Sequence, residues 1–325
     1  MKLKKIKRMV AVGTAILMTL SLAGCGIGSD SVKLGAAGVG GGYYAFSNAF
    51  AQIASSEDED LDFKVKATAG STANIRLLSD GYVDMAIAQA DLVDAAYNGT
   101  GATDKKRYRG YSAVASLYTE ACQIVVRSDS GIDSLDDLQG KKISVGEEES
   151  GTQRNAEQIL KMTGLVESLV DTVNLDYVDA ANELKSGQID AFFCTAGIQT
   201  SVIEELSKEC DVKLIGIDDK CRDRLKSVYG FYTDYTIPAG TYEGQTQDVV
   251  TLGVRAVLLA RDDMDEKIVE ELTGLLFEHA QDIQYSIALT FQIDESEAVK
   301  NVTIPFHDGA KAYYQKKGIE IPAEQ

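Results

Sequence analysis

The chain has 325 residues, of which 50 are acidic, 32 are basic and 5 are cysteine, and its formal net charge is −18 at pH 7. This excess of acid argues against a nucleic acid partner, because nucleic-acid-binding surfaces gather lysine and arginine. The cysteines form no CxxC pair and no cluster with histidine, so the sequence predicts no metal site. The length indicates about two domains.

The first 24 residues have the pattern of a secretion signal. A basic segment at 2–8 precedes an apolar core at 9–22, which is too short to span a membrane as a mature helix. The signal ends in LAGC, as bacterial lipoprotein signals do, so we expect Cys25 to carry a lipid. A plain secretory signal with an incidental cysteine is the alternative. Residues 25–31 would form a lipidated tether, and the mature protein would be extracytoplasmic and anchored to the membrane.

The spacing of apolar residues predicts alternating strands and helices after the tether. In chain order we expect a strand at 32–37, a glycine loop at 38–42, a helix at 43–53, a strand at 63–67, a helix at 71–81, a strand at 83–88 and a helix at 91–97. The loop begins like a dinucleotide-binding fingerprint, but Tyr43 occupies the place of its third glycine, which normally permits close packing of helix and strand. We therefore expect no nucleotide cofactor.

A long apolar stretch at 111–127 predicts a strand that crosses to a second domain. There we expect a short turn or helix at 135–138, strands at 142–145, 173–178, 189–194 and 212–217, and helices around 159–165, 180–185 and 202–206. From 228 the chain is expected to cross back. Its last elements are an extended segment at 229–237, a turn at 238–240, a strand at 249–259, a helix at 266–279 and a helix that contains Tyr313 and Tyr314.

Two stretches repeat at a constant offset of 106 residues: LSDGYVDMAIA, with Asp84, returns as LKSGQIDAFFC, with Asp190. Two like α/β halves, each with a helix N-terminus facing the space between them, are suited to close on something small. We expect two lobes, the first formed by 32–125 and 228–325 and the second by 126–227. Two crossovers between the lobes would act as a hinge.

Three stretches, in order behind the lipoprotein signal, carry a family resemblance. They are GSTANIRLLSDGYVDMAIAQAD, VGEEESGTQRNAEQIL, and IPFHDGA running into the two tyrosines near the C-terminus. With them the chain resembles the TAXI family, the extracytoplasmic solute receptors of one class of tripartite ATP-independent periplasmic (TRAP) transporters. The resemblance covers essentially the whole mature chain. It implies an α/β, type II periplasmic-binding fold whose two lobes close over one small organic solute, without enzymatic activity and without a cofactor.

The resemblance also implies partners and binding residues. The solute would be an amino acid such as glutamate or another small carboxylate, and the receptor, as a monomer, would deliver it to the permease subunits in the membrane. By motif position the ligand contacts would come from Gly42, Tyr43, Tyr44, Ser71, Asn74, Gln89, Ser150, Gly151, Thr152, Thr195 and Gly197.

The chain departs from the family at two loops. Glu147, Glu148 and Glu149 stand where many members have a small uncharged turn, and Ile198 stands where proline is common. These acidic side chains either bind the ammonium group of an amino acid or only face solvent. In both cases they make a highly anionic ligand a poor match.

Several candidates also have a structural explanation. Ser and Thr at 71, 150 and 152 are common helix caps, and adjacent tyrosines at a helix start are often half-buried packing. Asp84 and Asp190, before buried strands, suit a structural role better than catalysis. Arg76 and Arg154, the nearby permanent cations, are expected to be solvated.

Other functions remain as alternatives at this point. An enzyme on the same fold would need a reactive residue in the cleft, and His307 with Asp308 suits a structural cap better than acid/base chemistry. A substrate-binding lipoprotein of an ABC-type importer and an adhesive surface lipoprotein are further alternatives. Of the four cysteines left after Cys25, Cys210 and Cys221 are the nearest in sequence and the preferred disulfide pair.

Overall fold

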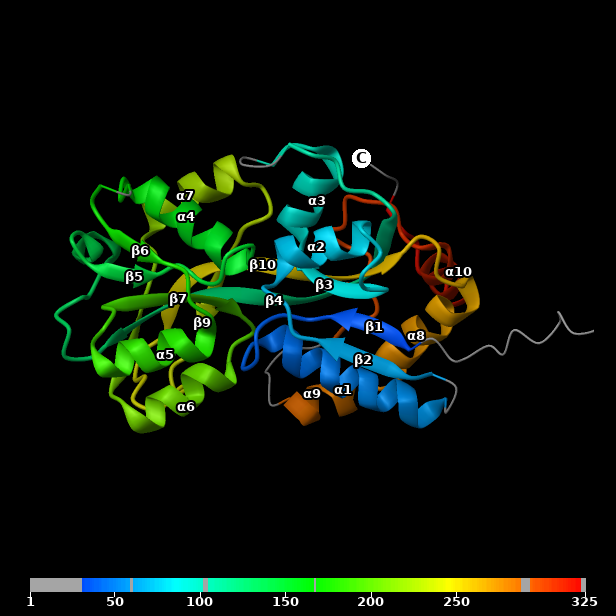
Figure 1. Ribbon diagram of the computed structural model, residues 1–325, viewed down its shortest axis with the longest axis horizontal. Helices are drawn as coiled ribbons and strands as arrows, with labels where there is room; N and C mark the ends of the chain where they lie inside the picture. The colour runs from blue at the N-terminus through cyan, green and yellow to red at the C-terminus, as the bar shows by residue number, and fades with distance from the viewer. Residues whose placement is uncertain (1–30, 59–60, 102–104, 167, 288–292, 323–325) are drawn as a thin grey trace, which may run out of the picture.

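The computed structural model describes residues 31–58, 61–101, 105–166, 168–287 and 293–322 (Figure 1). The predicted signal and Cys25, with all of the tether except Ser31, lie outside these ranges. Within the described ranges, no helix combines the length and the apolar character that a membrane span requires.

The first half of the molecule starts with alternating strands and helices, as predicted. They are β1 (Val32–Gly35), α1 (Gly42–Glu57), β2 (Phe63–Lys66), α2 (Ser71–Ser79), β3 (Met85–Gln89) and α3 (Ala90–Asn98). β1 pairs in parallel with both β2 and β3. The carboxyl ends of these strands therefore share one edge, where the helices begin.

The second half repeats this order. It contains η1 (Leu135–Leu138), β5 (Lys142–Ser144), α4 (Gly151–Thr163), β6 (Asp171–Val173), α5 (Tyr177–Ser186), β7 (Ala191–Ala196), α6 (Ser201–Glu209), β8 (Val212–Ile215), α7 (Asp219–Val228) and β9 (Thr233–Ile237). β5 pairs in parallel with β6 and β7, as β1 does with β2 and β3. The stretches that repeat at an offset of 106 residues thus belong to a repeated unit of three parallel strands within one ten-stranded sheet.

The repeated aspartates have the same structural role in both halves. An Oδ2 atom of Asp84 accepts a hydrogen bond from the Lys33 backbone N–H at 2.9 Å, and Asp190 Oδ2 accepts from the Lys142 N–H, also at 2.9 Å. The glycine three residues before each aspartate has a positive φ, 75° and 73°, which glycine adopts without strain. Each aspartate therefore ties the start of one parallel strand to the next.

Two long antiparallel strands join the halves: β4 (Tyr111–Arg127) and β10 (Val249–Arg261). β10 pairs with β3 in the first half, and β4 pairs with β7 in the second. Figure 1 shows both strands running between the two groups of helices. The remaining helices are α8 (Glu266–Glu278), α9 (Ala280–Ile287) and α10 (Asp308–Lys316), and they pack on the first half.

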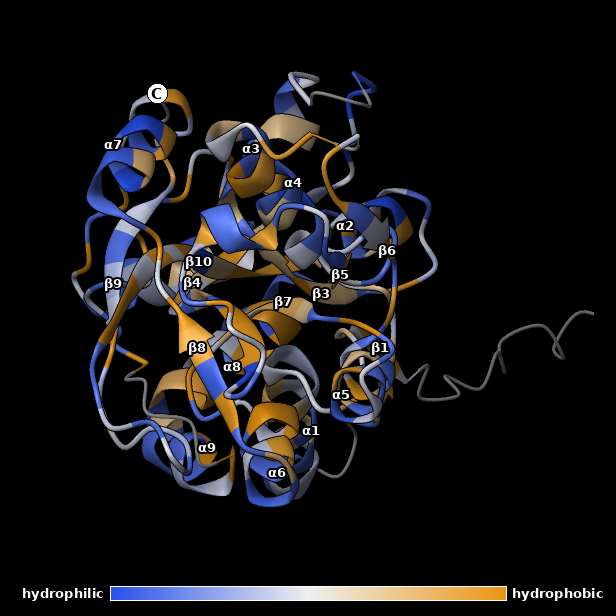
Figure 2. Ribbon diagram, turned by 90° about the vertical axis from the view of Figure 1, so that its left-hand side faces the viewer, coloured by the Kyte–Doolittle hydropathy of each residue, from blue (hydrophilic) through white to orange (hydrophobic). Residues whose placement is uncertain are grey.

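Each half has its own hydrophobic core. The first-half core takes residues of β4 up to Tyr118 and of β10 from Ala256, whereas the second-half cores take β4 from Ala121 and β10 up to Val254. Hydrophobic residues accordingly follow the central strands in Figure 2, and α7 presents a hydrophilic outer face. The cores change over near 120 in β4 and 255 in β10, the latter well beyond the expected crossing at 228.

The predicted strand at 173–178 is wrong. β6 ends at Val173, and α5 already begins at Tyr177, three residues before the expected helix. Asp176 is the reason, since its Oδ1 accepts a hydrogen bond from the Asp179 N–H at 2.8 Å and so caps the helix. The same kind of cap at Asp218 starts α7, a helix that apolar spacing did not reveal.

The preferred disulfide between Cys210 and Cys221 is also wrong, because all four described cysteines are free thiols. Cys221 packs in the core on one face of the second-half sheet, and Cys210 lies against the core on the other face. In β4, Ile124 and Val125 point to these two opposite faces, as successive residues of a strand do. The sheet therefore separates the two cysteines.

Candidate functional site

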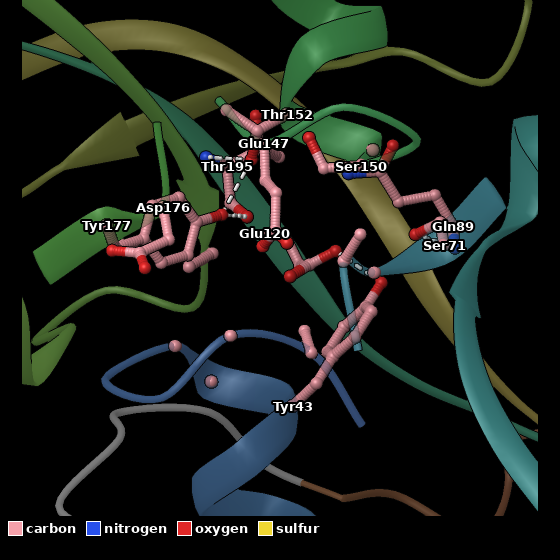
Figure 3. Close-up of a pocket in the computed structure, with 18 residues that line it drawn as sticks. Tyr43, Ser71, Gln89, Glu120, Glu147, Ser150, Thr152, Asp176, Tyr177 and Thr195 are labelled. Carbon is pink, nitrogen blue, oxygen red and sulfur yellow. Dashed lines mark hydrogen bonds between the residues drawn. The ribbon is translucent and has the colours of Figure 1, made fainter. Parts of the chain in front are cut away.

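A cavity lies between the halves, at the carboxyl ends of the parallel strands (Figure 3). It is lined by residues 37, 38, 41–43, 69–71, 89, 120, 147, 150–152, 176, 177, 195 and 196. Its volume is about 30 Å³ for the centres of water-sized molecules, and one bound water needs about 10–15 Å³ on that measure. A cavity of this size suits only a small solute.

The first half contributes three side chains to the cavity. Tyr43, in the first turn of α1, donates its hydroxyl proton to Glu120 Oε2 at 2.6 Å. Ser71 Oγ, at the start of α2, accepts a hydrogen bond from the Gln89 backbone N–H at 3.1 Å. The Gln89 side chain in turn reaches the second half, where its Nε2 donates to Asn155 Oδ1 at 3.0 Å.

The second half contributes a connected group of hydroxyls. Thr152 Oγ1, in the first turn of α4, lies 2.6 Å from the Tyr177 hydroxyl and accepts a hydrogen bond from the Thr195 N–H at 3.1 Å. The Tyr177 hydroxyl also lies 3.1 Å from the Thr195 carbonyl oxygen, to which it can donate. Ser150 caps α4, because its Oγ accepts from the Gln153 N–H at 2.9 Å.

The sequence repeat relates cavity positions of the first half to cavity positions of the second half. It also predicts one cavity position that the sequence analysis missed. Adding 106 to 89 gives 195, and adding 106 to 71 gives 177, so Gln89 corresponds to Thr195 and Ser71 to Tyr177. Thr195 was among the candidates, but Tyr177 was assigned to a strand and left out. The offset applied to Ser71 would have shown it.

Two other lining residues with ionisable side chains, Glu120 and Asp176, were missed as binding candidates, and Glu147, whose role the sequence left open, also lines the cavity. Glu120 has a sequence signal, since it is the one acidic residue between Tyr111 and Arg127 in a stretch that otherwise reads as a buried strand. A carboxylate there is costly unless something compensates it.

Three of the candidates, Tyr44, Asn74 and Gly197, do not line the cavity. Asn74 is fully buried and donates to the carbonyl oxygen of Ile87 at 2.8 Å, so it joins α2 to β3 behind the site. Tyr44 packs against the first-half core. Gly197 accepts a hydrogen bond from Thr200 Oγ1 at 2.6 Å, in the turn before α6. The other eight candidates, at 42, 43, 71, 89, 150–152 and 195, line the cavity.

Three carboxyl groups line the cavity, those of Glu120, Glu147 and Asp176. Burial raises the pKa of Glu120 to about 8, although hydrogen bonds from Tyr43 and Gln89 favour its ionised form. Burial and the nearby Asp176 carboxylate also raise the pKa of Glu147. None of the described residues that line the cavity is a lysine or an arginine.

Contacts between the halves surround the cavity. The carbonyl oxygen of Glu149 accepts hydrogen bonds from the Thr72 and Ala73 N–H groups of α2, at 3.1 and 3.2 Å. The Glu149 carboxylate meets Arg76 in a two-point ion pair, at 2.7 and 3.1 Å. Arg76 is thus paired across the halves rather than simply solvated as expected. Arg154 is paired too, at 3.7 Å from Glu157 in its own helix.

The features that suggested catalysis are structural. His307 Nδ1 accepts a hydrogen bond from the Gly309 N–H at 3.1 Å and caps α10, as expected. In the part of the chain that the structure describes, no group of three or more His, Cys, Asp or Glu side chains could hold a metal ion. The cavity brings together hydroxyls, amides and carboxylates, an arrangement suited to holding a solute by hydrogen bonds.

Solved structures with the same fold are distant in sequence. PhnD1 from Prochlorococcus marinus in complex with methylphosphonate matches with a TM-score of 0.55 and 13% identity, over 89% of this chain and 99% of that one. A protein of Bordetella bronchiseptica RB50 gives 0.53 and 18%, over 90% and 83%. A protein of Listeria monocytogenes provisionally described as an L-cystine ABC transporter gives 0.51 and 14%, over 82% and 98%. The fold is that of the α/β, type II periplasmic binding proteins, with two lobes.

A match to the NMT1-like family covers residues 34–318, which is nearly all of the chain after the predicted signal and tether. The members of this family are solute-binding proteins and not enzymes. The chain therefore belongs to the NMT1-like family, which corresponds to the TAXI solute receptors of TRAP transporters, and is the solute-binding protein of a transporter.

Proposed function

We propose that this protein is the extracytoplasmic receptor of a TAXI-type TRAP transporter, which captures a small amino acid or carboxylate, such as glutamate, and delivers it to a membrane permease. The observation that carries the proposal is the closed cavity, to which corresponding positions of both lobes contribute. Residues 71 and 89 face 177 and 195 there, so a solute would be bound by both lobes at once. Such a solute stabilises the closed form relative to an open one.

We propose that β4 and β10 form the hinge, with lobe boundaries near 120 and 255, where the hydrophobic cores change over. The binding set is then the eight predicted residues that line the cavity, together with Glu120, Glu147, Asp176 and Tyr177. Opening at these two strands would leave each core intact and break the contacts of Glu149. Because the closed receptor would differ in shape from the open one, a permease could recognise the closed, solute-bound form.

The receptor is proposed to act as a monomer held at the membrane by a lipid on Cys25. Labelling of the full chain with a radioactive or clickable fatty acid in a bacterial host tests the anchor. The label should appear on the wild type and be lost in Cys25→Ser; equal labelling of both would contradict the anchor.

A substrate-binding protein of an ABC-type importer is the second candidate, favoured by the L. monocytogenes neighbour. The two candidates differ in their energy source. Uptake by cells that carry the receptor and its permease should stop when an ionophore collapses the ion gradient, with ATP still present, if the transporter is of the TRAP type. Uptake that survives the ionophore and follows ATP would favour the ABC importer.

The solute-binding function itself is tested on the unlipidated chain from Gly26. A thermal-shift screen against amino acids and small carboxylates comes first, since a ligand at 100 times its Kd stabilises the fold by about 2.7 kcal/mol. We expect a saturable shift for one solute class, reduced in Ser71→Ala and Thr152→Ala. The absence of any shift, together with no co-purified solute by mass spectrometry, would contradict the receptor function.

A further inference from the structure

The cavity contains a buried hydrogen-bond acceptor without a donor. Gln89 is only 1% exposed, and its Oε1 atom has no hydrogen-bond partner among the described residues. Its Nε2 atom is held by Asn155, which fixes the way the amide faces. Buried polar atoms of this kind normally have a partner, so a solute that offers an N–H or O–H donor at this point would satisfy the atom.

A glycine, Gly151, lies directly against this amide. A Cβ added at Gly151 would lie 2.7 Å from Gln89 Oε1 and 2.5 Å from Gln89 Cδ. Any larger residue at the start of α4 would therefore cover or displace the acceptor. Because it has no side chain, Gly151 allows the first turn of α4 to lie against the Gln89 amide without covering the Oε1 atom.

A buried carboxylate without a cation lines the same cavity. Glu120 is 3% exposed, and its Oε2 atom accepts a hydrogen bond from the Tyr43 hydroxyl. A buried carboxylate is stable as an anion only when it is paired, and no described lysine or arginine lines the cavity. A positively charged group on the solute would supply both the missing charge and the missing donor.

The rest of the lining disfavours a solute with two negative charges. Glu147 and Asp176 add two further carboxyl groups to the cavity wall. Favourable sites for one anionic group are the N-termini of α1 and α4, which both begin at the cavity. The lining thus offers acceptors for one cation and helix starts for one anion.

We propose that Glu120 and Gln89 Oε1 form an ammonium subsite, so that the receptor selects neutral zwitterionic amino acids and rejects the same acids without their amino group. This inference rests on the proposed solute-binding function and names the residues that decide its specificity. The proposal predicts that glutamate binds more weakly than neutral amino acids of similar size, because its second carboxylate would lie near Glu147 and Asp176.

Matched pairs of solutes that differ only in the amino group test the subsite. The pairs are L-alanine and propionate, L-glutamine and glutaramate, and L-glutamate and glutarate, measured by calorimetry at pH 7.5. We expect at least one amino acid to bind at least about tenfold more tightly than its partner. Glu120→Gln, which can still accept from Tyr43, should remove most of that preference. Glu148→Gln, which removes the same charge from an exposed residue of the neighbouring loop, should leave it unchanged.

Proton release gives a second readout that does not depend on any variant. The titratable groups that interact electrostatically with Glu120 are Tyr43, Asp91, Tyr118, Cys122, Tyr177 and Cys194. The raised pKa of Glu120 means that it largely holds a proton near neutral pH when no solute is bound. An ammonium ligand favours the ionised form, so binding should release a proton, and affinity should rise with pH until about pH 8. Calorimetry in buffers of different ionisation enthalpy measures this release.

Two results would overturn the subsite. One is a deamino acid that binds as tightly as its amino acid, with no effect of Glu120→Gln; the receptor function would then stand and only the specificity would fail. The other is binding by none of the six solutes. In that case mass spectrometry of gently purified protein tests the solute-binding function. A co-purified solute would support that function, although the subsite fails, whereas protein without a solute would contradict both.

Discussion

Helices α2 and α5 occupy corresponding places in the two lobes, and they differ at their N-termini. α5 has its own cap, since Asp176 Oδ1 accepts from the Asp179 N–H at 2.8 Å. α2 follows Gly70 and has no side-chain cap; its Thr72 and Ala73 N–H groups donate instead to the Glu149 carbonyl oxygen of the other lobe. We call this contact the interlobe cap.

Similar sequences can therefore assign a helix N-terminus to different partners. Free N–H groups at a helix start favour an anion, and on this basis α2 was expected to face the ligand. In the closed structure a backbone carbonyl takes that place. The first turn of α2 therefore contributes to closure, because its N–H groups lose a protein partner whenever the lobes separate.

The largest effect is expected from Gly151→Ala, which tests whether close contact of the lobes is needed. The new methyl group would lie 2.5 Å from Gln89 Cδ, so either the amide leaves Asn155 or the lobes stay apart. A buried partner left unpaired costs about 1–3 kcal/mol, which predicts a loss of solute affinity of about tenfold. Calorimetry measures the loss.

Gly274→Ala, in α8 and with its nearest contact to Tyr313 at 3.4 Å, is the control and should bind normally. Normal binding by Gly151→Ala would show that the closed contact is not required.

An intermediate effect is expected from Asp176→Ala, which removes the cap of α5. Loss of an N-cap costs about 1 kcal/mol of stability, and urea unfolding should show it with and without solute. Asp176→Asn keeps a capping side chain and loses the charge, so it should restore most of the stability. Equal destabilisation by both variants would mean that charge, and not capping, matters at this position.

The smallest effect is expected from the ion pair that accompanies the interlobe cap. Arg76 and Glu149 are 38% and 41% exposed, and exposed pairs contribute about 0.2–1 kcal/mol. A double-mutant cycle with Arg76→Gln and Glu149→Gln should show a coupling of this size in solute affinity, weaker at high salt. The exposed Lys208–Glu204 pair within α6 is the control, and its removal should leave affinity unchanged. If the cycle shows no coupling in solute affinity, the ion pair does not contribute to closure of the lobes.

Much of the fold could be predicted because its signals are local. The glycine before Asp84 and the one before Asp190 mark equivalent turns, and apolar spacing located β3, β4 and β10 to within a few residues. Capping residues are a weaker signal, which is why the start of α5 at Asp176 was missed. The disulfide was predicted from sequence distance alone, and the sheet between Cys210 and Cys221 contradicts it.

The candidate site could be predicted only in part. Eight of the eleven candidates line the cavity, because the ends of parallel strands and the starts of helices meet at one edge of each sheet. Asn74 lies at such a helix start and yet points into the core, since the direction of a side chain depends on the turn of the helix. Glu120 was missed because β4 was treated only as a connection between lobes.

The two like halves, the order of their elements and the repeated turns can be read from the amino-acid sequence, since they follow from periodicity, glycine positions and short-range hydrogen bonds. Which groups face one another across the cavity depends on the three-dimensional arrangement of the two lobes. Tyr43 meets Glu120, 77 residues away, and Arg76 meets Glu149, 73 residues away. Contacts over such separations depend on how the lobes close, and no local pattern in the sequence encodes that geometry.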